Sequence, residues 1–346
     1  MIEKKDIRNL TLEEIIHFCT ENNLPKFRAK QIWEWLWKKR VNSFEEITSL
    51  PKETRRLLNI YFTINTINIH KAEKSRDGTI KYSFQLHDKL LVEGVLIPSQ
   101  KRLTACVSSQ VGCSLVCNFC ATGTLKLKRN VTSAEIYDQV FILNQEAMLN
   151  FGRPLSNIVY MGMGEPLLNY KSVLESVYFI TNEQGLGMSP KRITVSTAGI
   201  SKMIKKLGDD QINFNLAISL HSASNDKRDI LMPLNKKIRL KELAEAVRYF
   251  YDKTGIRVTY EYILFQNIND SIEDAQKLVR FAKNTPCKIN LIEYNPVDGL
   301  PYKKSSNTVT QNFILYLEEH NIIVNLRRSK GKDISAACGQ LANKLK

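Results

Sequence analysis

The chain has no long apolar segment. None of its 346 residues fall in a stretch approaching the roughly 18 consecutive apolar residues that a membrane-spanning helix requires. The amino terminus, MIEKKDIRNLTLEEII, alternates charged with apolar residues, unlike a secretory signal peptide or a membrane anchor. We therefore expect a cytoplasmic protein with no membrane partner.

Internal repeats and low-complexity segments are also absent, and the composition does not favour disorder. Hydrophobic residues make up 43% of the chain, which includes 14 Phe, 13 Tyr and 3 Trp. A chain of this length and composition can bury one large core and a smaller accessory unit. We therefore expect a folded protein with more than one structural unit.

Acidic residues are scarce in two segments of a chain whose formal net charge is +15. Residues 101–130 contain no acid, and the tail 327–346 has Asp333 as its one acid among basic residues. Such segments serve either as solvated charged faces or as contacts for phosphate groups, and the charge alone does not decide between them. Of these two interpretations, phosphate contact is the more specific one, and it predicts a polyanionic partner.

A fourth cysteine is missing beside the most informative motif, CSLVCNFC, which contains Cys113, Cys117 and Cys120. Seven cysteines in a chain without an export signal favour metal or redox chemistry over structural disulfides. A structural zinc site uses four closed ligands, and an iron–sulfur cluster usually takes four thiolates. Three thiolates on one loop predict a cluster with one open iron that can bind a substrate.

Secondary-structure patterns divide the chain into four parts. Residues 1–60 show helical spacing, with Thr11 as a capping start, a helix over 27–37 and another opening at Pro51. Residues 61–98 alternate with a period of two and predict a small antiparallel β linker. The core is expected over 99–333, and 334–346 form a carboxy-terminal segment.

The core pattern predicts an α/β fold with a parallel sheet. Its β-rich runs are TACVSSQ, NIVYMGM, RITVSTAG, FNLAISLH, VTYEYILF, INLIEYNP and IIVNLRR. Expected helices between them include 133–150, 171–181, 240–254, 271–284 and 310–320. These units are too few for a closed eight-fold barrel, so we expect a partial (β/α) barrel or an open doubly wound sheet.

Polar groups gather where these strands are expected to end. Ligands bind at the carboxyl ends of strands in such folds. Each group alone is more typical of a turn or a cap than of a binding site. The candidates are 162–165, 196–199, 219–221 and Asn295.

The cysteine spacing resembles the cluster loop of the radical S-adenosylmethionine (SAM) superfamily, and Phe119 matches the aromatic residue usual there. The run MGMGEP resembles that superfamily's GGEP motif. VSTAG, ISLHS, LIEYNP and ACGQL together resemble the RlmN/Cfr family of RNA adenine methyltransferases over most of the chain. The resemblance implies a partial radical SAM barrel with an amino-terminal helical RNA-binding domain.

The resemblance also implies the cofactors. One [4Fe-4S] cluster would be bound by Cys113, Cys117 and Cys120 and by exchangeable SAM, whose reductive cleavage gives a 5′-deoxyadenosyl radical. Two SAM molecules would be used per turnover, and an electron donor such as flavodoxin would supply the electron to a monomeric enzyme. The expected SAM contacts are Gly164, Glu165, Ser196, Ser219, Leu220, His221 and Asn295.

Two further cysteines acquire roles through the same resemblance. By sequence alone, Cys106 and Cys338 are each more typical of small buried residues than of nucleophiles. The resemblance implies that Cys338 carries the methyl group as S-methylcysteine and that its radical adds to the adenine. Cys106 would then release the adduct through a transient disulfide with Cys338. Glu93 matches the family's proton-acceptor glutamate, although Cys106 competes for that role.

The run EPLLN favours the RlmN type over the Cfr type. The resemblance then implies methylation of carbon 2 of adenosine 2503 in 23S rRNA and of adenosine 37 in tRNAs. A carbon-8 enzyme of the Cfr type is the alternative within the family. A non-catalytic RNA-binding protein or an iron–sulfur redox protein is the alternative from another class.

Overall fold

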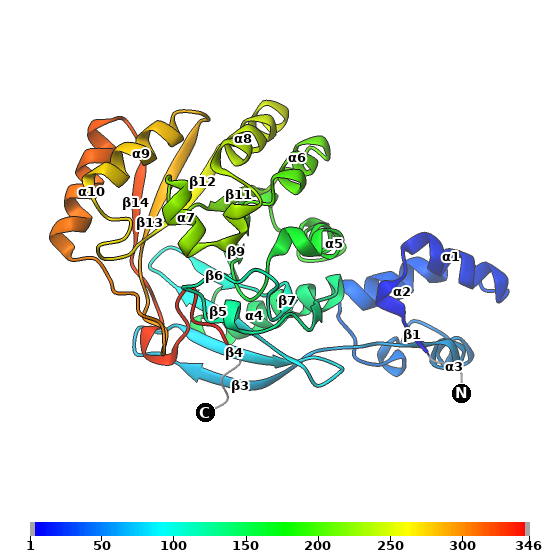
Figure 1. Cartoon of the computed structure of the whole chain (residues 1–346). Helices are drawn as coiled ribbons and strands as arrows, with labels where there is room; N and C mark the ends of the chain where they lie inside the picture. Colours follow the sequence, from blue (N-terminus) through cyan, green and yellow to red (C-terminus); the bar gives the residue numbers. More distant parts are fainter. Residues whose placement is uncertain (1–3, 343–346) are drawn as a thin grey trace.

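The computed structural model describes residues 4–342, and its main feature is one ten-stranded sheet (Figure 1). The strand order is β14-β13-β12-β11-β10-β9-β6-β5-β4-β3. The strands from β6 to β14 in this sheet all run parallel to their neighbours. They are β6 (Leu103–Cys106), β9 (Asn157–Tyr160), β10 (Ile193–Thr197), β11 (Asn215–Ser219), β12 (Val258–Leu264), β13 (Cys287–Glu293) and β14 (Val324–Arg327).

Helices connect these parallel strands, as the sequence pattern predicts. Capping boxes at Thr132 and Ser271 begin two of them, and left-handed glycines at Gly152 and Gly255 end two. No helix in the described part of the chain is long and apolar enough to cross a membrane. The helices are α4 (Ser133–Phe151), α5 (Tyr170–Thr181), α6 (Ser201–Asp209), α7 (Asn225–Leu231), α8 (Leu240–Thr254), α9 (Ile272–Ala282) and α10 (Asn307–Glu319).

The sheet remains open, which confirms the expected partial barrel. Its two edge strands, β14 and β3, are not paired with each other in the described residues. The predicted linker strands are present as β3 (Asn68–Lys74), β4 (Ile80–Gln85) and β5 (Leu91–Pro98), and β5 pairs antiparallel with β6. They therefore extend the core sheet. The division at residues 60, 98 and 333 stays a prediction, and 1–3 and 343–346 lie outside the described residues.

Short elements complete the structure. Two small strand pairs flank the main sheet, and single helical turns occupy several connections. The pairs are β1 (Lys5–Asp6) with β2 (Phe62–Thr63) and β7 (Gln110–Val111) with β8 (Arg129–Asn130). The turns are η1 (Ile7–Asn9), η2 (Phe44–Glu46), η3 (Thr122–Thr124), η4 (Pro166–Asn169), η5 (Pro190–Arg192), η6 (Pro233–Lys236) and η7 (Lys332–Ile334).

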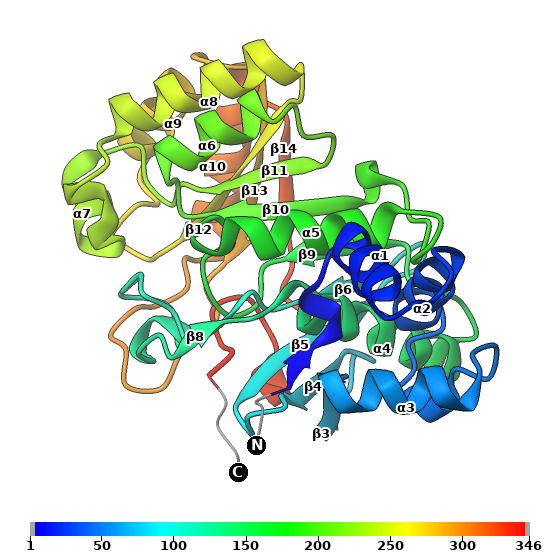
Figure 2. The same ribbon diagram turned by 90° about the vertical axis from the view of Figure 1, so that its right-hand side faces the viewer.

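The amino-terminal region forms three helices, of which α2 packs against α4 and α5 (Figure 2). The three helices are α1 (Leu12–Glu21), α2 (Phe27–Trp37) and α3 (Lys52–Tyr61), and Thr11 caps α1 as expected. Trp37 is 1% exposed and stacks on Phe179 of α5, with ring centroids 3.5 Å apart. Trp37 is therefore a core residue.

A buried ion pair joins this helical region to the core. Asp138 of α4 is fully buried, and one of its carboxylate oxygens lies 2.9 Å from Arg8 Nη1 and 2.8 Å from Arg40 Nε. The backbone N–H of Ile67 also donates to Asp138. One carboxylate therefore holds three segments that precede the core. Removing one partner of such a group leaves uncompensated buried charge.

We therefore expect Asp138→Ala to lower the free energy of unfolding by about 3–5 kcal/mol, because Arg8 and Arg40 lose their counter-charge. Thermal or urea unfolding of the purified protein measures the change. Asp252→Ala is the matched control, since Asp252 is exposed and pairs with the exposed Arg248 at 3.8 Å. Equal stability losses in both variants would contradict this account.

Candidate active site

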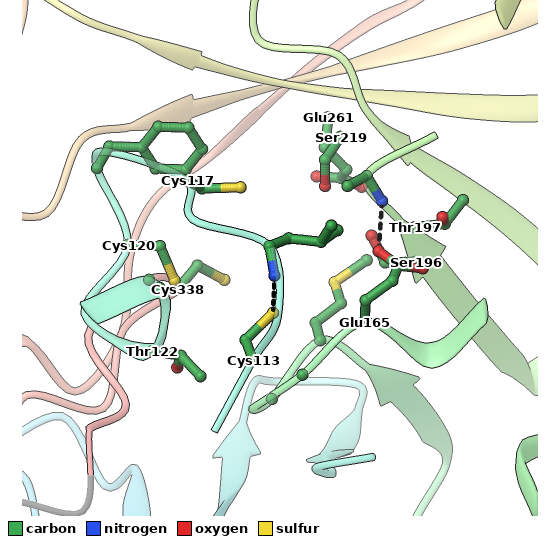
Figure 3. Close-up of a pocket in the computed structure, with 18 of the residues that line it drawn as sticks. Cys113, Cys117, Cys120, Thr122, Glu165, Ser196, Thr197, Ser219, Glu261 and Cys338 are labelled. Atoms are coloured by element: carbon green, nitrogen blue, oxygen red, sulfur yellow. Dashed lines mark hydrogen bonds between the residues drawn. The ribbon is translucent and has the colours of Figure 1, made fainter. Parts of the chain in front are cut away.

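A cavity lies at the carboxyl ends of the parallel strands (Figure 3). It encloses about 950 Å³, part of it open to solvent. In a parallel α/β sheet this edge is where strand-end side chains and loop residues converge. Nine predicted site residues line it: Cys113, Cys117, Cys120, Gly164, Glu165, Ser196, Ser219, His221 and Cys338.

The cysteine loop forms one wall of the cavity. Cys113 follows β7, and its sulfur accepts a hydrogen bond from the Leu115 N–H at 3.3 Å. Burial raises the pKa of the Cys113 thiol to about 11, and it also raises the pKa values of Cys117 and Cys120. In the described part of the chain no group of three or more His, Cys, Asp or Glu side chains is placed to hold a metal ion. Three-cysteine ligation therefore stays a prediction.

The residues present nevertheless fit an iron–sulfur cluster with an open iron. Three thiols from one loop line a single cavity, and thiolate is the usual ligand of such clusters. A buried polar atom without a partner, Asn295 Oδ1, lies in the same region, because the Asn295 amide donates to the Cys338 carbonyl at 3.4 Å. An unpartnered buried acceptor is costly unless a ligand or water satisfies it.

Glu165 lies across the cavity from the cysteines (Figure 3). Its carboxylate is 3% exposed and accepts from the N–H groups of Leu167 at 3.0 Å and Ala198 at 2.7 Å. Burial raises the pKa of this carboxyl, while the two hydrogen bonds oppose the rise. These bonds hold Glu165 at the junction of β9 and β10, where the sequence places it.

The glycines Gly162 and Gly164 of MGMGEP lie against the loop that follows β6. A Cβ on Gly164, whose φ is +95°, would lie 2.4 Å from the Gln110 side chain. A Cβ on Gly162 would lie 2.6 Å from Ser108 Oγ. Both glycines thus admit close packing of the loop after β6 against the loop after β9. Gly164 also lines the cavity, so its contact with SAM stays a prediction.

His221 is held as a neutral imidazole. Its Nδ1 accepts from the Ile263 N–H at 3.1 Å, which places the ring hydrogen on Nε2. Burial, together with the nearby Arg228 guanidinium, lowers the pKa of His221 to about 3. Phe119 packs edge-on against the ring at 4.9 Å. His221 can therefore act as a hydrogen-bond donor in the cavity wall.

Two expected SAM contacts lie outside the residues that line this cavity. Leu220 is fully buried, and its carbonyl accepts from Arg228 Nε at 3.1 Å. Its side chain packs into the core, so any contact with a ligand would use its backbone. Asn295 is 3% exposed and contacts the segment that carries Cys338.

Cys106 and Cys338 meet in a second cavity of about 550 Å³, also partly open. Cys338 lines both cavities and lies beside Cys120 (Figure 3). All seven cysteines are free thiols, so the expected Cys106–Cys338 disulfide is not formed in this structure. Burial, with a smaller contribution from the neighbouring Cys338, raises the pKa of the Cys106 thiol to about 12.

Glu93 lies in a third cavity, beneath the carboxy-terminal segment. It is 3% exposed, accepts from the Ala342 N–H at 2.9 Å and lies 3.7 Å from Lys81 Nζ. Val95 pairs with Cys106 in the sheet, so Glu93 and Cys106 point to the same face. Its expected role as proton acceptor is not tested by these contacts.

The sequence patterns did not identify several charged residues of the site. Arg228 of α7 is fully buried and donates to the carbonyl groups of Ala198 and Leu220, which joins the ends of β10 and β11. Arg327 pairs with Glu261 at 2.9 Å and lines both cavities that Cys338 lines. For Arg327, the available indication was its position as a basic residue at the end of the predicted strand IIVNLRR.

Comparison with known proteins defines the class. A model of the radical SAM superfamily matches residues 107–282. A crystal structure of a radical SAM methyltransferase from Sphaerobacter thermophilus is 37% identical, with a TM-score of 0.91, and the match covers 98% of this chain and 100% of that one. The chain belongs to the radical SAM superfamily, which implies a [4Fe-4S] cluster and SAM.

The family follows from closer relatives. A model of the ribosomal RNA large subunit methyltransferase N-terminal domain matches residues 5–64. The "probable dual-specificity RNA methyltransferase RlmN" of Christiangramia forsetii is 55% identical over 99% of this chain and 97% of its own length. The "dual-specificity RNA methyltransferase RlmN" of Geobacter sulfurreducens is 42% identical over 98% and 92%. The chain belongs to the RlmN family.

The buried state of Cys106 makes a prediction about its reactivity. A pKa of about 12 leaves almost no thiolate at pH 7, and the thiolate is the reactive form. Iodoacetamide should therefore modify Cys106 at least ~100-fold more slowly in the native protein than in the urea-denatured chain. Mass spectrometry of the Cys106 peptide measures both rates. Native modification at the denatured rate would contradict the buried position.

Proposed function

We propose that this enzyme methylates carbon 2 of adenosine 2503 in 23S rRNA and of adenosine 37 in tRNAs. The observation that supports this best is the position of Cys338, which lines the cavity of the three cluster cysteines and the cavity of Cys106. The Cys338 side chain could therefore react first in the cavity of the cluster cysteines and then in the cavity of Cys106. Membership in the RlmN family supports the RNA substrate.

The cofactor site would be divided between the two walls of the first cavity. Cys113, Cys117 and Cys120 would bind the cluster, and Glu165 and His221 lie opposite with hydrogen-bonding groups for SAM. Together the cluster and SAM supply a carbon radical after one-electron reduction. Reduction by flavodoxin and action as a monomer stay predictions.

Cys338 would carry the transferred carbon as S-methylcysteine. The adenine edge carbon is electron-poor and cannot attack a methyl sulfonium, whereas a carbon radical on the Cys338 methyl group can add to it. The resulting adduct joins protein to RNA through the Cys338 sulfur. The adduct radical must lose the carbon-2 proton and one electron, which the oxidised cluster would accept. Cys106 would then attack the Cys338 sulfur and break the bond between that sulfur and the transferred carbon, which takes a proton to complete the methyl group. A transient Cys106–Cys338 disulfide remains, and a dithiol reductant regenerates both thiols.

The proton on carbon 2 of the adduct needs an acceptor within this chain. Burial raises the pKa of Cys106, so its thiolate is scarce before RNA binds. Arg327 lies close enough to both cysteines to oppose that rise. Glu93 faces the same side of the sheet and remains the second candidate, held beneath the carboxy-terminal segment by the Ala342 N–H.

RNA would reach the cysteines through a basic wall. Arg328 and Lys330 line the cavity that contains Cys106 and Cys338, where their charges suit the phosphates next to an extruded adenosine. The amino-terminal domain would contribute shape and phosphate contacts through α1 to α3. Exposed basic residues on α2 and its end support this: Lys30, Lys38 and Lys39.

The cluster ligands can be tested by one paired substitution. Anaerobically reconstituted wild-type protein should hold about four irons per chain and absorb broadly near 400 nm, as a [4Fe-4S] protein does. Cys113→Ala should lose most of this iron, because Cys113 lines the cavity of the cluster loop. Cys287→Ala should keep it, since Cys287 lies at the start of β13. A wild-type protein that binds one zinc and no iron would refute the proposal.

The role of Cys106 can be tested with RNA. Cys106→Ala should accumulate a covalent RNA–protein adduct, because the addition to adenine proceeds and the release does not. Gel electrophoresis after denaturation detects the adduct. Turnover of Cys106→Ala at the wild-type rate would contradict the role.

Regiochemistry needs nucleoside analysis. Expression in a strain lacking the modification, followed by mass spectrometry of rRNA and tRNA digests, should yield 2-methyladenosine. An 8-methyladenosine product would replace the proposal with the Cfr type. No methylated adenosine from a protein that retains its cluster would favour a redox or RNA-binding protein.

A further inference from the structure

Two attachments connect the segment that carries Cys338 to the cysteine loop and to a hairpin of the main sheet, in addition to its contacts with Glu93, Glu293 and Asn295. We call residues 328–342 the strap; it follows β14 and includes η7. At one attachment, the Ala121 N–H donates to the Gly339 carbonyl at 2.7 Å, and Thr122 Oγ1 donates to the Leu341 carbonyl at 2.6 Å. This attachment joins the strap to the cysteine loop.

The other attachment is on the β3–β4 hairpin, far along the chain from the cysteine loop (Figure 1). Asp333 of the strap accepts from Ser75 Oγ at 2.5 Å and from the Arg76 N–H at 3.1 Å. In return, Asp77 of the hairpin accepts from the Gly331 N–H at 2.9 Å. Each segment thus gives one carboxylate to the backbone of the other.

Close packing accompanies these hydrogen bonds. Gly331 has a φ of +66°, and a Cβ there would lie 2.9 Å from Thr79 Cγ2 and 2.7 Å from the Ala336 side chain. Thr79 is fully buried and Ser75 is 5% exposed. The hairpin turn and the strap therefore fit each other without space for an added methyl group.

Both carboxylates are charged at neutral pH. Burial alone would raise the pKa of Asp77, but hydrogen bonds from the Gly331 and Thr79 N–H groups outweigh it and lower the pKa to about 2. The hydrogen bond from Ser75 lowers the pKa of Asp333. Charge-assisted hydrogen bonds of this kind are about twice as strong as neutral ones.

We propose that Asp77 and Asp333 form a clamp that positions Cys338 between its two cavities, and so act as positioning residues for methyl transfer. The inference rests on the function proposed above. Four residues separate Asp333 from Cys338, and the five steps between their Cα atoms can span up to ~17 Å when extended. With the hairpin attachment lost, Gly339 would still be held, but the backbone before Cys338 would lose its hydrogen bonds to the hairpin and keep the half-exposed Lys332–Glu293 ion pair.

If the strap is loose, we expect SAM cleavage to become uncoupled from methyl transfer to RNA. The Cys338 methyl group must meet the radical in one cavity and the adenine near Cys106 in the other. A misplacement of about 1 Å at a reacting group can cost about 100-fold in rate. The cluster ligands are on a different segment from the clamp, so radical generation should continue while transfer to RNA slows.

The test uses full-length holoenzyme with an RNA substrate and dithionite as reductant. In the double variant Asp77→Asn/Asp333→Asn, methylated adenosine formed per 5′-deoxyadenosine should fall at least ~10-fold. Iron content and 5′-deoxyadenosine formation should stay near wild type. Asp252→Asn is the matched control, because it removes the charge of an aspartate on α8 whose ion-pair partner is Arg248.

Hydrogen–deuterium exchange provides a readout that does not depend on activity. Peptides covering the described strap residues should exchange faster in the double variant than in Asp252→Asn or the wild type. An unchanged ratio of methylated adenosine to 5′-deoxyadenosine would overturn the positioning role. Parallel loss of iron, SAM cleavage and methylation would also overturn it, since that pattern indicates a purely structural role.

The same data separate this inference from the proposed function. A wild-type holoenzyme that cleaves SAM but methylates no RNA, or that cleaves no SAM, would refute the function and with it the positioning role. If the wild type methylates RNA and the double variant gives the same ratio of methylated adenosine to 5′-deoxyadenosine, the clamp is refuted and the proposed function stands.

Discussion

The hydrogen bond from the Ala121 N–H to the Gly339 carbonyl, at 2.7 Å, is the constraint on which the site depends. It joins two segments more than two hundred residues apart, and it places Cys338 next to the loop of Cys113, Cys117 and Cys120. Because the bond is between backbone groups, it does not depend on which side chains occupy these positions. Together with the hydrogen bond from Thr122 to the Leu341 carbonyl, this contact keeps Cys338 in the same cavity as the three loop cysteines.

Buried charge is the second organising feature. Arg228 joins the ends of β10 and β11, the buried Glu261 pairs with the partly exposed Arg327 beside the two cysteine cavities, and Asp138 holds the amino-terminal region. Each of these groups is satisfied by several partners, which offsets the cost of removing a charge from water. The site thus has a polar frame around Cys106 and the three loop cysteines, whose burial disfavours ionisation.

Much of the fold could be predicted because the pattern of each element is local. The seven β-rich runs correspond to the seven parallel strands, and α2 and α8 have the predicted bounds. Alternation of strands and helices sufficed for the fold class. The addition of β3 to β5 to the core sheet was not predictable, because strand pairing between β5 and β6 depends on contacts that a periodicity does not encode.

The site was predicted unevenly, for physical reasons. Cys113, Cys117, Cys120 and Glu165 stand in motifs whose spacing is tied to their chemistry, and all line the cavity. Arg228 and Glu261 have no such motif; a buried arginine in a short helix looks like a surface residue in the sequence. Gly162 and Gly164 lie where the neighbouring chain leaves no room for a side chain, and their motif did not reveal this close packing.

The sequence by itself determined which residue types are available: three thiols at fixed spacing on one loop, two more thiols far apart, and strands that end in polar groups. Those properties depend only on neighbouring residues, so they can be read from the sequence before the fold is known. Only the tertiary structure decided that Cys338 lies between two cavities and that the strap is held at both ends. Such proximity comes from chain topology and backbone hydrogen bonds, for which a residue's neighbours in sequence carry no information.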